Sequence, residues 1–273
     1  MAKLTKEQRK LHQQAEDILK KDVLTTSEKE FVFENWNEAA HHNIGMAGAF
    51  FTPFNLALDF AFDVGGLRII DLCAGIGVLA YAAKLRYPHI KEIVCIEQNY
   101  DYVAIGRKLL PEATWIHADV FDWKELNLGT FDCAISNPPF GKVKRSGNGY
   151  KYKGQEFEYH VISIASQLAR EGVFIVPQMS SSFRYSARRN YERVEGRGSD
   201  FENLMGFSME TGAGVDTSFY AKEWKNGAPV TEIVTIDFEE MPEEKDIQIL
   251  PEKVVSAHIT PIHPTYTEQL SLF

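Results

Sequence analysis

The sequence is poor in cysteine, and it has neither long apolar runs nor an excess of positive charge. Its three cysteines form no Cys-x-x-Cys pair and no Cys/His cluster with metal-ligand spacing, which predicts reduced thiols, no metal site and a cytoplasmic location. No run of about 18 apolar residues is present, so we expect no membrane-spanning helix. The first residues also lack the apolar segment of a signal peptide.

The charge balance gives no general sign of a nucleic-acid-binding protein. The formal net charge is −9, from 29 Lys and Arg against 38 Asp and Glu. An acidic body can still carry a local basic loop that follows a phosphate backbone, so the net charge does not exclude nucleic acid. Hydrophobic residues make up 44% of the chain, which is enough for a large core and argues against global disorder.

Strand-like and helical segments alternate through the middle of the chain. Strands are predicted at "LRIIDL", "EIVCIEQ", "ATWIHADV", "FDCAISN" and "VFIVP", and helices at "VLAYAAKLRY", "YDYVAIGRKLLP" and "EFEYHVISIASQLAREG". The last helix is expected to end at Gly172. This alternation predicts an α/β fold with a parallel sheet and helices on both faces. After residue 200, "LMGFSMET", "SFYAKEW", an Asn226-Gly227 turn and "VTEIVTIDF" predict antiparallel strands at the sheet edge.

We divide the chain into three parts. Residues 1–45 are predicted to be a helical extension, with one helix over residues 4–21 and a second one capped by Thr26 or Ser27. Residues 46–240 form the α/β domain, in which Thr52 is expected to cap a helix that starts at Pro53. Residues 241–273, rich in Pro, Glu and His, are expected to be a flexible tail.

The first candidate site is "IIDLCAGIGVLA", residues 69–80, where a strand ends at Asp71 and a glycine loop leads into a helix. Gly75 and Gly77 let a ligand approach the backbone, and the helix start offers free amide groups. Glu97 ends the next strand, where a carboxylate suits a ribose diol. The pattern fits a dinucleotide almost as well as S-adenosylmethionine (SAM), and an ordinary strand-to-helix turn is a third reading. Asp71 favours SAM, because it can meet the cationic amino group of the methionine part.

The second candidate site is Asn137-Pro138-Pro139-Phe140, which follows the strand "FDCAIS". An aromatic amine is a poor nucleophile, because its lone pair is conjugated into the ring. The Asn137 side-chain oxygen and the Pro138 carbonyl can accept its hydrogens and localise that pair, while the two prolines fix their direction in advance. Phe140 offers a face for a flat base. The sequence therefore predicts methyl transfer from SAM to an amino group, with positioning as the main catalytic effect.

The segments "GAFFTP", "DLCAGIG", "HADVF" and "SNPPFG", in this order, resemble the amino-group DNA methyltransferases. They are most similar to the adenine-specific branch related to the modification subunits of bacterial type I restriction systems, over roughly residues 45–180. The resemblance implies a Rossmann-like class I SAM-dependent methyltransferase with a mainly parallel seven-stranded sheet and an antiparallel edge hairpin. It also implies a bacterial or bacteriophage enzyme that methylates the N6 amino group of adenine in DNA after flipping the base out of the helix.

The matching motif positions imply the roles of individual residues. Asn137, Pro138, Pro139 and Phe140 would receive the target base. The residues around SAM would be Phe51, Thr52 and Pro53 on the methionine side, Asp71, Cys73, Gly75 and Gly77 at the floor, Glu97 at the ribose, Asp119 at the adenine, and Asn137. Asp119 could instead be a strand-end cap. The chain departs from the family at Cys73, where many methyltransferases have glycine, and no evident target-recognition domain follows residue 180.

Two basic loops, residues 141–155 and 181–198, are predicted to contact nucleic acid. Their lysines and arginines can meet phosphates, and Tyr150 and Tyr152 can stack on bases, although both loops could be ordinary solvated surface. The predicted contacts are Lys142, Lys144, Arg145, Lys151, Lys153, Arg184 and Arg188.

The last five residues resemble the peptide by which bacterial replication and repair proteins dock on the DNA sliding clamp. In this comparison Gln269 forms hydrogen bonds, and Leu270, Leu272 and Phe273 supply the apolar contacts. The alternative is a tail that folds back on its own domain. For the whole chain the alternatives are the same chemistry on ribosomal RNA or a protein glutamine, an inactive DNA- or clamp-binding protein, and a dehydrogenase. Intact Asn137 and Glu97 argue against an inactive protein.

Overall fold

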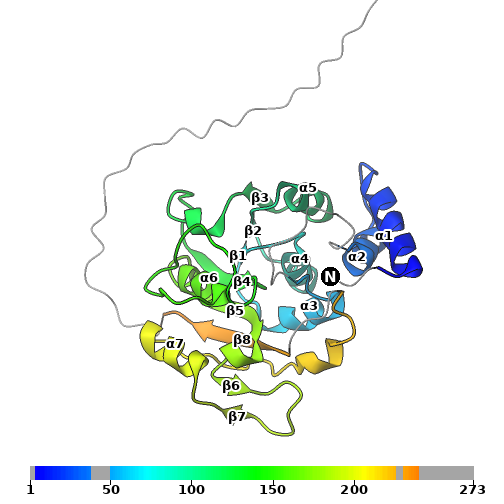
Figure 1. Cartoon of the computed structure of the whole chain (residues 1–273). Helices are drawn as coiled ribbons and strands as arrows, with labels where there is room; N and C mark the ends of the chain where they lie inside the picture. Colours follow the sequence, from blue (N-terminus) through cyan, green and yellow to red (C-terminus); the bar gives the residue numbers. More distant parts are fainter. Residues whose placement is uncertain (1–3, 38–49, 226–229, 240–273) are drawn as a thin grey trace, which may run out of the picture. The chain divides into compact units, whose positions relative to one another are not determined.

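The computed structural model describes residues 4–37, 50–225 and 230–239 (Figure 1). Two helices come first, α1 at Lys6–Leu19 and α2 at Thr26–Asn35. Both begin with a capping box, in which the cap side chain and the side chain three residues later satisfy each other's backbone amides. The structure therefore contains both of the helices predicted in this segment.

The centre of the protein is a six-stranded sheet in the order β3-β2-β1-β4-β5-β8. β8 runs antiparallel to β5, and the other neighbouring strands pair in parallel. The strands are β1 Arg68–Leu72, β2 Glu92–Glu97, β3 Thr114–His117, β4 Phe131–Ser136, β5 Ala169–Pro177 and β8 Thr231–Asp237. Their continuous apolar runs are typical of strands that are covered on both faces.

Helices cover both faces of this sheet (Figure 1). Successive side chains of a strand point to opposite faces, so Ile69 of β1 joins the core on one side and Ile70 the core on the other. The first core contains side chains of α1 to α5, and the second contains those of α6 and α7. The helices are α3 Phe54–Phe60, α4 Val78–Arg86, α5 Tyr100–Leu109, α6 Phe157–Ala165 and α7 Arg197–Met205. The predicted doubly wound α/β architecture is confirmed.

Short elements complete the described part of the chain. They are the 3-10 turns η2 Ala61–Asp63, η3 Val120–Asp122, η4 Gln178–Ser180 and η5 Thr217–Tyr220, and a separate two-stranded sheet of β6 Phe183–Arg184 and β7 Glu192–Arg193. No helix among the described residues is long and apolar enough to cross a membrane. The same residues contain no group of three metal-ligating side chains.

The prediction of seven strands is wrong, because the sheet of the described residues has six. "LMGFSMET" supplies the end of α7 and one isolated bridge between Glu210 and Thr235, and "SFYAKEW" begins with η5. Asp216 accepts a hydrogen bond from the Ser218 amide and so caps η5, an interaction that an apolar pattern does not show. The antiparallel edge is thus β8 with a single bridge rather than a hairpin. The Asn226-Gly227 turn lies outside the described residues.

Three local predictions also need correction. The cap of α2 is Thr25, one residue before the predicted Thr26. α6 ends at Ala165, and Gly172 lies within β5, where a side chain would stand 2.4 Å from the Phe174 ring. Pro53 occupies the cap position of α3, and it makes no side-chain hydrogen bond there. Thr52 therefore caps no helix, and its hydroxyl instead accepts a hydrogen bond from Asn137.

Candidate active site

The strand order reverses between β1 and β4, because β1 leads to β2 on one side while β4 returns on the other. Ligands of open α/β sheets bind at such a switch point, beyond the carboxyl ends of the strands. Both candidate motifs lie there: the glycine loop follows β1, and Asn137 follows β4. The fold therefore brings together two segments that are about 60 residues apart in the chain.

The glycine loop turns sharply between β1 and α4. Cys73, Gly75 and Gly77 have φ angles of 63°, 57° and 89°, in the left-handed region that favours glycine. A side chain on Gly75 would stand 2.7 Å from the Phe51 ring, so the loop and the segment ahead of α3 pack closely only without it. Cys73 adopts a glycine-like conformation, which costs about 1–2 kcal/mol for a residue with a side chain.

Asp71 lies at the floor of this loop and is only 1% exposed. Neither of its carboxylate oxygens has a hydrogen-bond partner among the described residues. Burial raises the pKa of Asp71 well above its usual value, and the charge of Glu97 adds to this rise. The Ala80 amide in the first turn of α4 opposes it, although its geometry does not meet that of a hydrogen bond. A buried acceptor pair without donors suits a cationic ligand group, so Asp71 fits the predicted contact with the amino group of SAM.

Glu97 connects the glycine loop to the end of β2. One carboxylate oxygen accepts a 2.8 Å hydrogen bond from the Gly75 amide, and the other accepts a 2.7 Å bond from the Asn99 amide. Burial raises the pKa of Glu97, while these amides lower it. Each oxygen keeps a lone pair beyond these bonds, so the carboxylate remains able to accept from a ribose diol.

Asp119 follows β3 and has the cap geometry that sequence reasoning left as the alternative. One of its oxygens accepts from the Phe121 amide, at 3.0 Å. The other accepts from the Gln98 side chain at 2.9 Å and the Ser146 hydroxyl at 2.7 Å. Asp119 therefore joins the end of β3 to the loop 141–155, and its contact with an adenine amino group stays a prediction.

Asn137 is held by the segment that precedes α3. Its Nδ2 donates to the Phe50 carbonyl at 2.7 Å and to the Thr52 hydroxyl at 2.9 Å. The Phe50 carbonyl can only accept, so the amide nitrogen must face it and the orientation of the amide is determined. The side-chain oxygen of Asn137 is then left buried and without a partner among the described residues. This free acceptor is the feature that the predicted amine chemistry requires.

Aromatic rings surround the same corner. The Phe50 ring lies 5.6 Å from Phe140 and 6.4 Å from Trp224, measured between ring centroids. Phe140 is 9% exposed, so a base that stacks on it would share the ring with Phe50 or displace it. Sequence reasoning missed Trp224, because it falls in a segment interpreted as an edge strand. Pro138 and Pro139 are buried, as a fixed corner requires.

Comparisons with known proteins agree with this geometry. Residues 58–152 match the family model "Methyltransferase small domain". An rRNA N(6)-adenosine-methyltransferase of Caenorhabditis elegans is 25% identical over 150 residues, which cover 52% of this chain and 65% of that protein, slightly less than two thirds. The family match and the shared fold support SAM as the cofactor.

Two solved structures share the fold at low sequence identity. One is a type I restriction-modification methyltransferase subunit from Streptococcus thermophilus, with 16% identity, a TM-score of 0.50, and coverage of 80% of this chain and 51% of that one. The other, from Listeria monocytogenes, is assigned as a class I SAM-dependent methyltransferase, with 13% identity, a TM-score of 0.51, and coverage of 89% and 82%. This chain has the class I SAM-dependent methyltransferase fold.

A buried carboxylate supports the corner formed by residues 137–140, where the sequence predicts the target base. Glu158 of α6 accepts a 2.7 Å hydrogen bond from the Gly141 amide, directly after Phe140, and a 2.7 Å bond from the Ser180 hydroxyl after β5. Burial raises the pKa of Glu158, and the bonds from Ser180 and Gly141 oppose that rise. Sequence reasoning placed Glu158 on a helix but could not show its partners, which lie 17 and 22 residues away.

The loop 141–155 is built around a neutral histidine. His160 accepts from the Gly149 amide through Nδ1 at 2.9 Å, and its Nε2 lies 3.0 Å from the Gly154 carbonyl, which fixes the proton on Nε2. Burial lowers the pKa of His160 to about 4. Tyr152 packs against this ring and is 8% exposed, so the prediction that it stacks on a base is wrong.

The predicted nucleic-acid contacts differ in their surroundings. Arg145 donates within its own loop, to Asn148 and to the Gly154 carbonyl. Lys151 lies over the Tyr150 ring. The exposed ones are Lys142, Lys144, Lys153, Arg184 and Arg188. The predicted clamp residues Gln269, Leu270, Leu272 and Phe273 lie outside the described residues.

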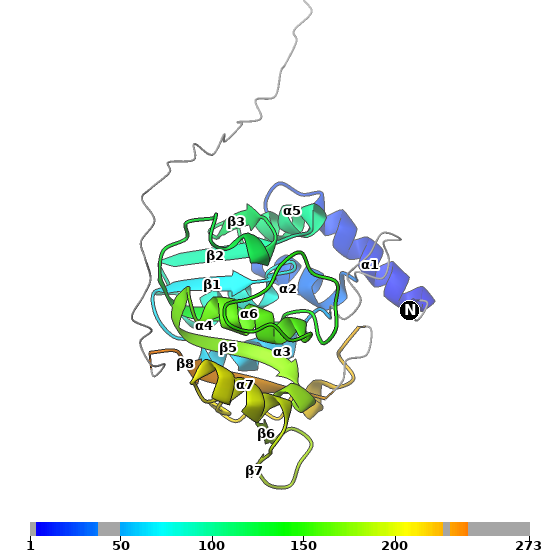
Figure 2. The ribbon, with the colours of Figure 1, turned by 60° about the vertical axis from the view of Figure 1, so that its left-hand side comes forward.

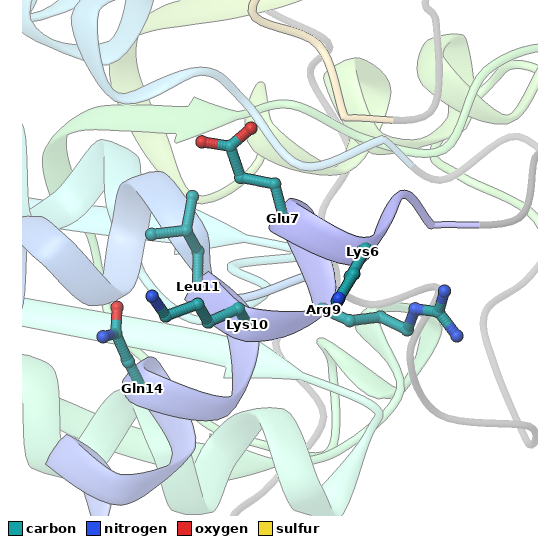
Figure 3. A pocket seen from close by; sticks show the side chains of 6 residues that line it. All are labelled: Lys6, Glu7, Arg9, Lys10, Leu11 and Gln14. Atoms are coloured by element: carbon teal, nitrogen blue, oxygen red, sulfur yellow. The ribbon is translucent and has the colours of Figure 1, made fainter.

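A hollow of about 730 Å³ lies on α1, and none of the residues that line it is a predicted site residue (Figure 3). Its lining consists of Lys6, Glu7, Arg9, Lys10, Leu11 and Gln14. The lining comes from one helix and combines three cations with one carboxylate. It offers no buried acceptor of the kind found at Asp71 and Asn137.

Proposed function

We propose that this methyltransferase transfers the methyl group of SAM to the exocyclic N6 amino group of adenine in DNA, with the target base flipped out of the helix. The observation that carries the proposal is the buried, unpaired side-chain oxygen of Asn137. Buried polar atoms in native proteins nearly always have partners, so an orphaned one at a binding corner indicates a ligand donor.

In this proposal each residue of the site has a binding or positioning role. When bound, SAM supplies a methyl group that its sulfonium already activates. Asp71 holds the amino group of SAM and Glu97 holds its ribose. The side-chain oxygen of Asn137 and the Pro138 carbonyl accept the two amino hydrogens of adenine. That arrangement localises the nitrogen lone pair and aims it along the line of transfer, so positioning and preorganised acceptors supply the rate.

DNA is the preferred acceptor for two reasons. The "GAFFTP" segment, which resembles the adenine-specific DNA methyltransferases, is the segment whose Phe50 and Thr52 hold Asn137. The Streptococcus thermophilus protein with the same fold is a type I restriction-modification subunit, which favours a role in DNA modification. RNA is the second candidate, because the Caenorhabditis elegans relative is an rRNA N(6)-adenosine-methyltransferase.

The test measures the product directly. The purified protein is incubated with SAM and either plasmid DNA or ribosomal RNA, and the nucleosides are then analysed by mass spectrometry. We expect N6-methyldeoxyadenosine from DNA, and none with Asn137→Ala under the same conditions. N6-methyladenosine from RNA alone would move the assignment to the second candidate. Methylation of neither nucleic acid would refute both.

We also propose that the protein works in the bacterial or phage-infected cytoplasm and that residues 269–273 bind the sliding clamp. A clamp contact would raise the local concentration of the enzyme on newly copied DNA. It would offset the weak attraction of an acidic body for DNA, since the formal net charge is −9.

A further inference from the structure

Residues 183–193, named here the arginine hairpin, form a small sheet of their own. β6 and β7 pair antiparallel, with Arg184 opposite Glu192, and the loop 185–191 joins them. Figure 2 shows this sheet apart from the six-stranded one. The hairpin follows β5 and η4, and β5 ends at the carboxyl edge of the sheet beside β4.

The arginine hairpin carries positive charge on a protein whose net charge is negative. Arg184, Arg188 and Arg189 are exposed, and their side chains have no hydrogen-bond or ion-pair partner among the residues that the structure describes. The loop 185–191, "YSARRNY", contains no acidic residue. Unpaired guanidinium groups on a chain of net charge −9 favour a polyanion that approaches from this side. Arg193 differs, because it is bound to Glu202 and Glu210.

A buried carboxylate fixes the base of the hairpin. Glu232 of β8 is 1% exposed, and it accepts hydrogen bonds from the Tyr185 amide at 2.8 Å, the Ser186 amide at 3.0 Å and the Ser186 hydroxyl at 2.8 Å. Gln178 donates to Glu232 at 2.7 Å and to the Ser186 carbonyl at 2.8 Å. A charge buried with this many donors is satisfied, and it holds the chain in one arrangement.

The loop itself contains a strained residue that is also held. Ala187, directly before the two arginines of the loop, has a φ angle of 59°. Its amide donates a 3.0 Å hydrogen bond to Asp216, and the Arg188 amide donates at 3.1 Å to the Tyr185 carbonyl. Such strain persists only where the surroundings fix it, and it is typical of functional loops. The direction in which Arg188 and Arg189 leave the body is therefore defined.

The hairpin base and the target-base corner belong to one hydrogen-bonded region. Glu158 joins Gly141, after the Asn137 corner, to Ser180. Gln178 lies in the same 3-10 turn as Ser180, and it binds Ser186 of the hairpin loop. The base of the hairpin is therefore connected through hydrogen bonds to the segment that follows the predicted base corner.

We propose that the arginine hairpin binds the phosphate backbone of the DNA substrate, with Arg188 and Arg189 as the phosphate contacts. The inference rests on the proposed function. It assigns to a defined surface the task of holding the substrate. Glu232 and Asp216 act as positioning residues for this surface.

The test compares two double variants that each remove two exposed cations. In Arg188→Ala/Arg189→Ala the hairpin loses them, and in Lys6→Ala/Lys10→Ala the α1 surface of Figure 3 loses them. Binding to a fluorescein-labelled adenine-containing duplex is measured by anisotropy, without SAM, between about 50 and 200 mM salt. Each lost phosphate contact should lower the slope of log affinity against log salt by about 0.9. We expect a slope lower by about 2 and at least about tenfold weaker binding for the hairpin variant. The α1 variant should bind as the wild type does.

Several outcomes would overturn the inference. They are a wild-type slope for the hairpin variant, equal losses in both variants, and a wild-type protein that does not bind the duplex. Arg188→Lys/Arg189→Lys keeps the charge and should retain the slope. Binding and product are separate readouts: a hairpin effect without N6-methyldeoxyadenosine would contradict the proposed function alone. Methylation and binding untouched by the hairpin variant would contradict this inference alone.

Discussion

Replacing Asp71 with asparagine should make the protein more stable without cofactor and less able to bind it. The carboxylate is buried and neither oxygen has a partner among the described residues, so above the folded pKa of Asp71 the protein holds a charge at a desolvated position. Burial raises the pKa of Asp71 well above 3.8, and each unit of that rise costs about 1.4 kcal/mol once the group ionises. The amide removes the charge but leaves polar atoms without partners, so we expect a net gain of about 1–3 kcal/mol. At about 2–4 °C per kcal/mol, the melting temperature should rise by several degrees.

The direction of the pKa shift of Asp71 determines how the stability difference changes with pH. Because the folded pKa of Asp71 lies above the unfolded one, the folded protein binds the extra proton, and the wild type loses stability as pH rises from 3.8 to the folded pKa. Asparagine does not titrate. The advantage of Asp71→Asn should therefore be absent at acidic pH and largest above the folded pKa, as thermal unfolding at a series of pH values can measure.

SAM should shift the difference in stability back toward the wild type. A charge-assisted hydrogen bond to the amino group of SAM is worth about 1.5–3 kcal/mol, so the variant should bind SAM roughly 10- to 150-fold more weakly. At a SAM concentration of 100 times the wild-type Kd, the wild type gains about 2.7 kcal/mol, whereas a variant weakened 100-fold gains about 0.4 kcal/mol. Calorimetric titration and thermal unfolding with and without SAM measure both quantities. A variant that melts earlier without SAM, or that binds SAM as tightly as the wild type, would refute the role given to Asp71.

Three further predictions concern the corner and the tail. Asn137→Ala should lower turnover by at least about 100-fold while SAM affinity stays near normal, because a preorganised acceptor is lost; collapse of SAM affinity in a calorimetric titration would contradict its role. Glu158→Ala should lower kcat by at least about tenfold, with unchanged SAM affinity, because the Gly141 amide and the Ser180 hydroxyl lose their acceptor. Glu158→Gln should recover most of the lost activity, since the glutamine oxygen can accept from the Gly141 amide while the Ser180 hydroxyl accepts from the glutamine nitrogen. Equal steady-state rates in the two variants would exclude a positioning role for Glu158. Removing residues 269–273 should abolish clamp pull-down and leave methylation of short oligonucleotides intact, and pull-down that survives would show that the tail is not the clamp contact.

The sheet and its helices were predictable because each of their signals is local. β1, β2 and β4 are continuous apolar runs bounded by turn residues, and such runs fold as buried strands wherever they lie. The region after residue 200 was not predictable in the same way. Its apolar residues alternate as in a strand, but a side-chain cap at Asp216 and a left-handed Gly206 define a turn and the end of a helix.

The sequence predicted only those candidate site residues that stand at recognisable motif positions. Asp71, Glu97 and Asn137 occupy positions whose backbone context shows in the sequence, and the structure brings them to one edge of the sheet. The roles of Glu158 and Glu232 were missed, because they depend on hydrogen-bond partners that are distant in the sequence. Glu232 binds a loop 46 residues away in the chain, and the spacing of residues does not encode such a contact.

The hydrogen bonds of Asn137 to Phe50 and Thr52 join the predicted base contact to the predicted SAM contact. The stretch expected to touch the methionine end of SAM is also the stretch that orients the acceptor for the base. If SAM binding orders the segment with Phe50 and Thr52, the base should bind more tightly. By thermodynamic reciprocity, base binding would then strengthen SAM binding by the same factor. The enzyme would then capture a base most readily when a methyl donor is already in place.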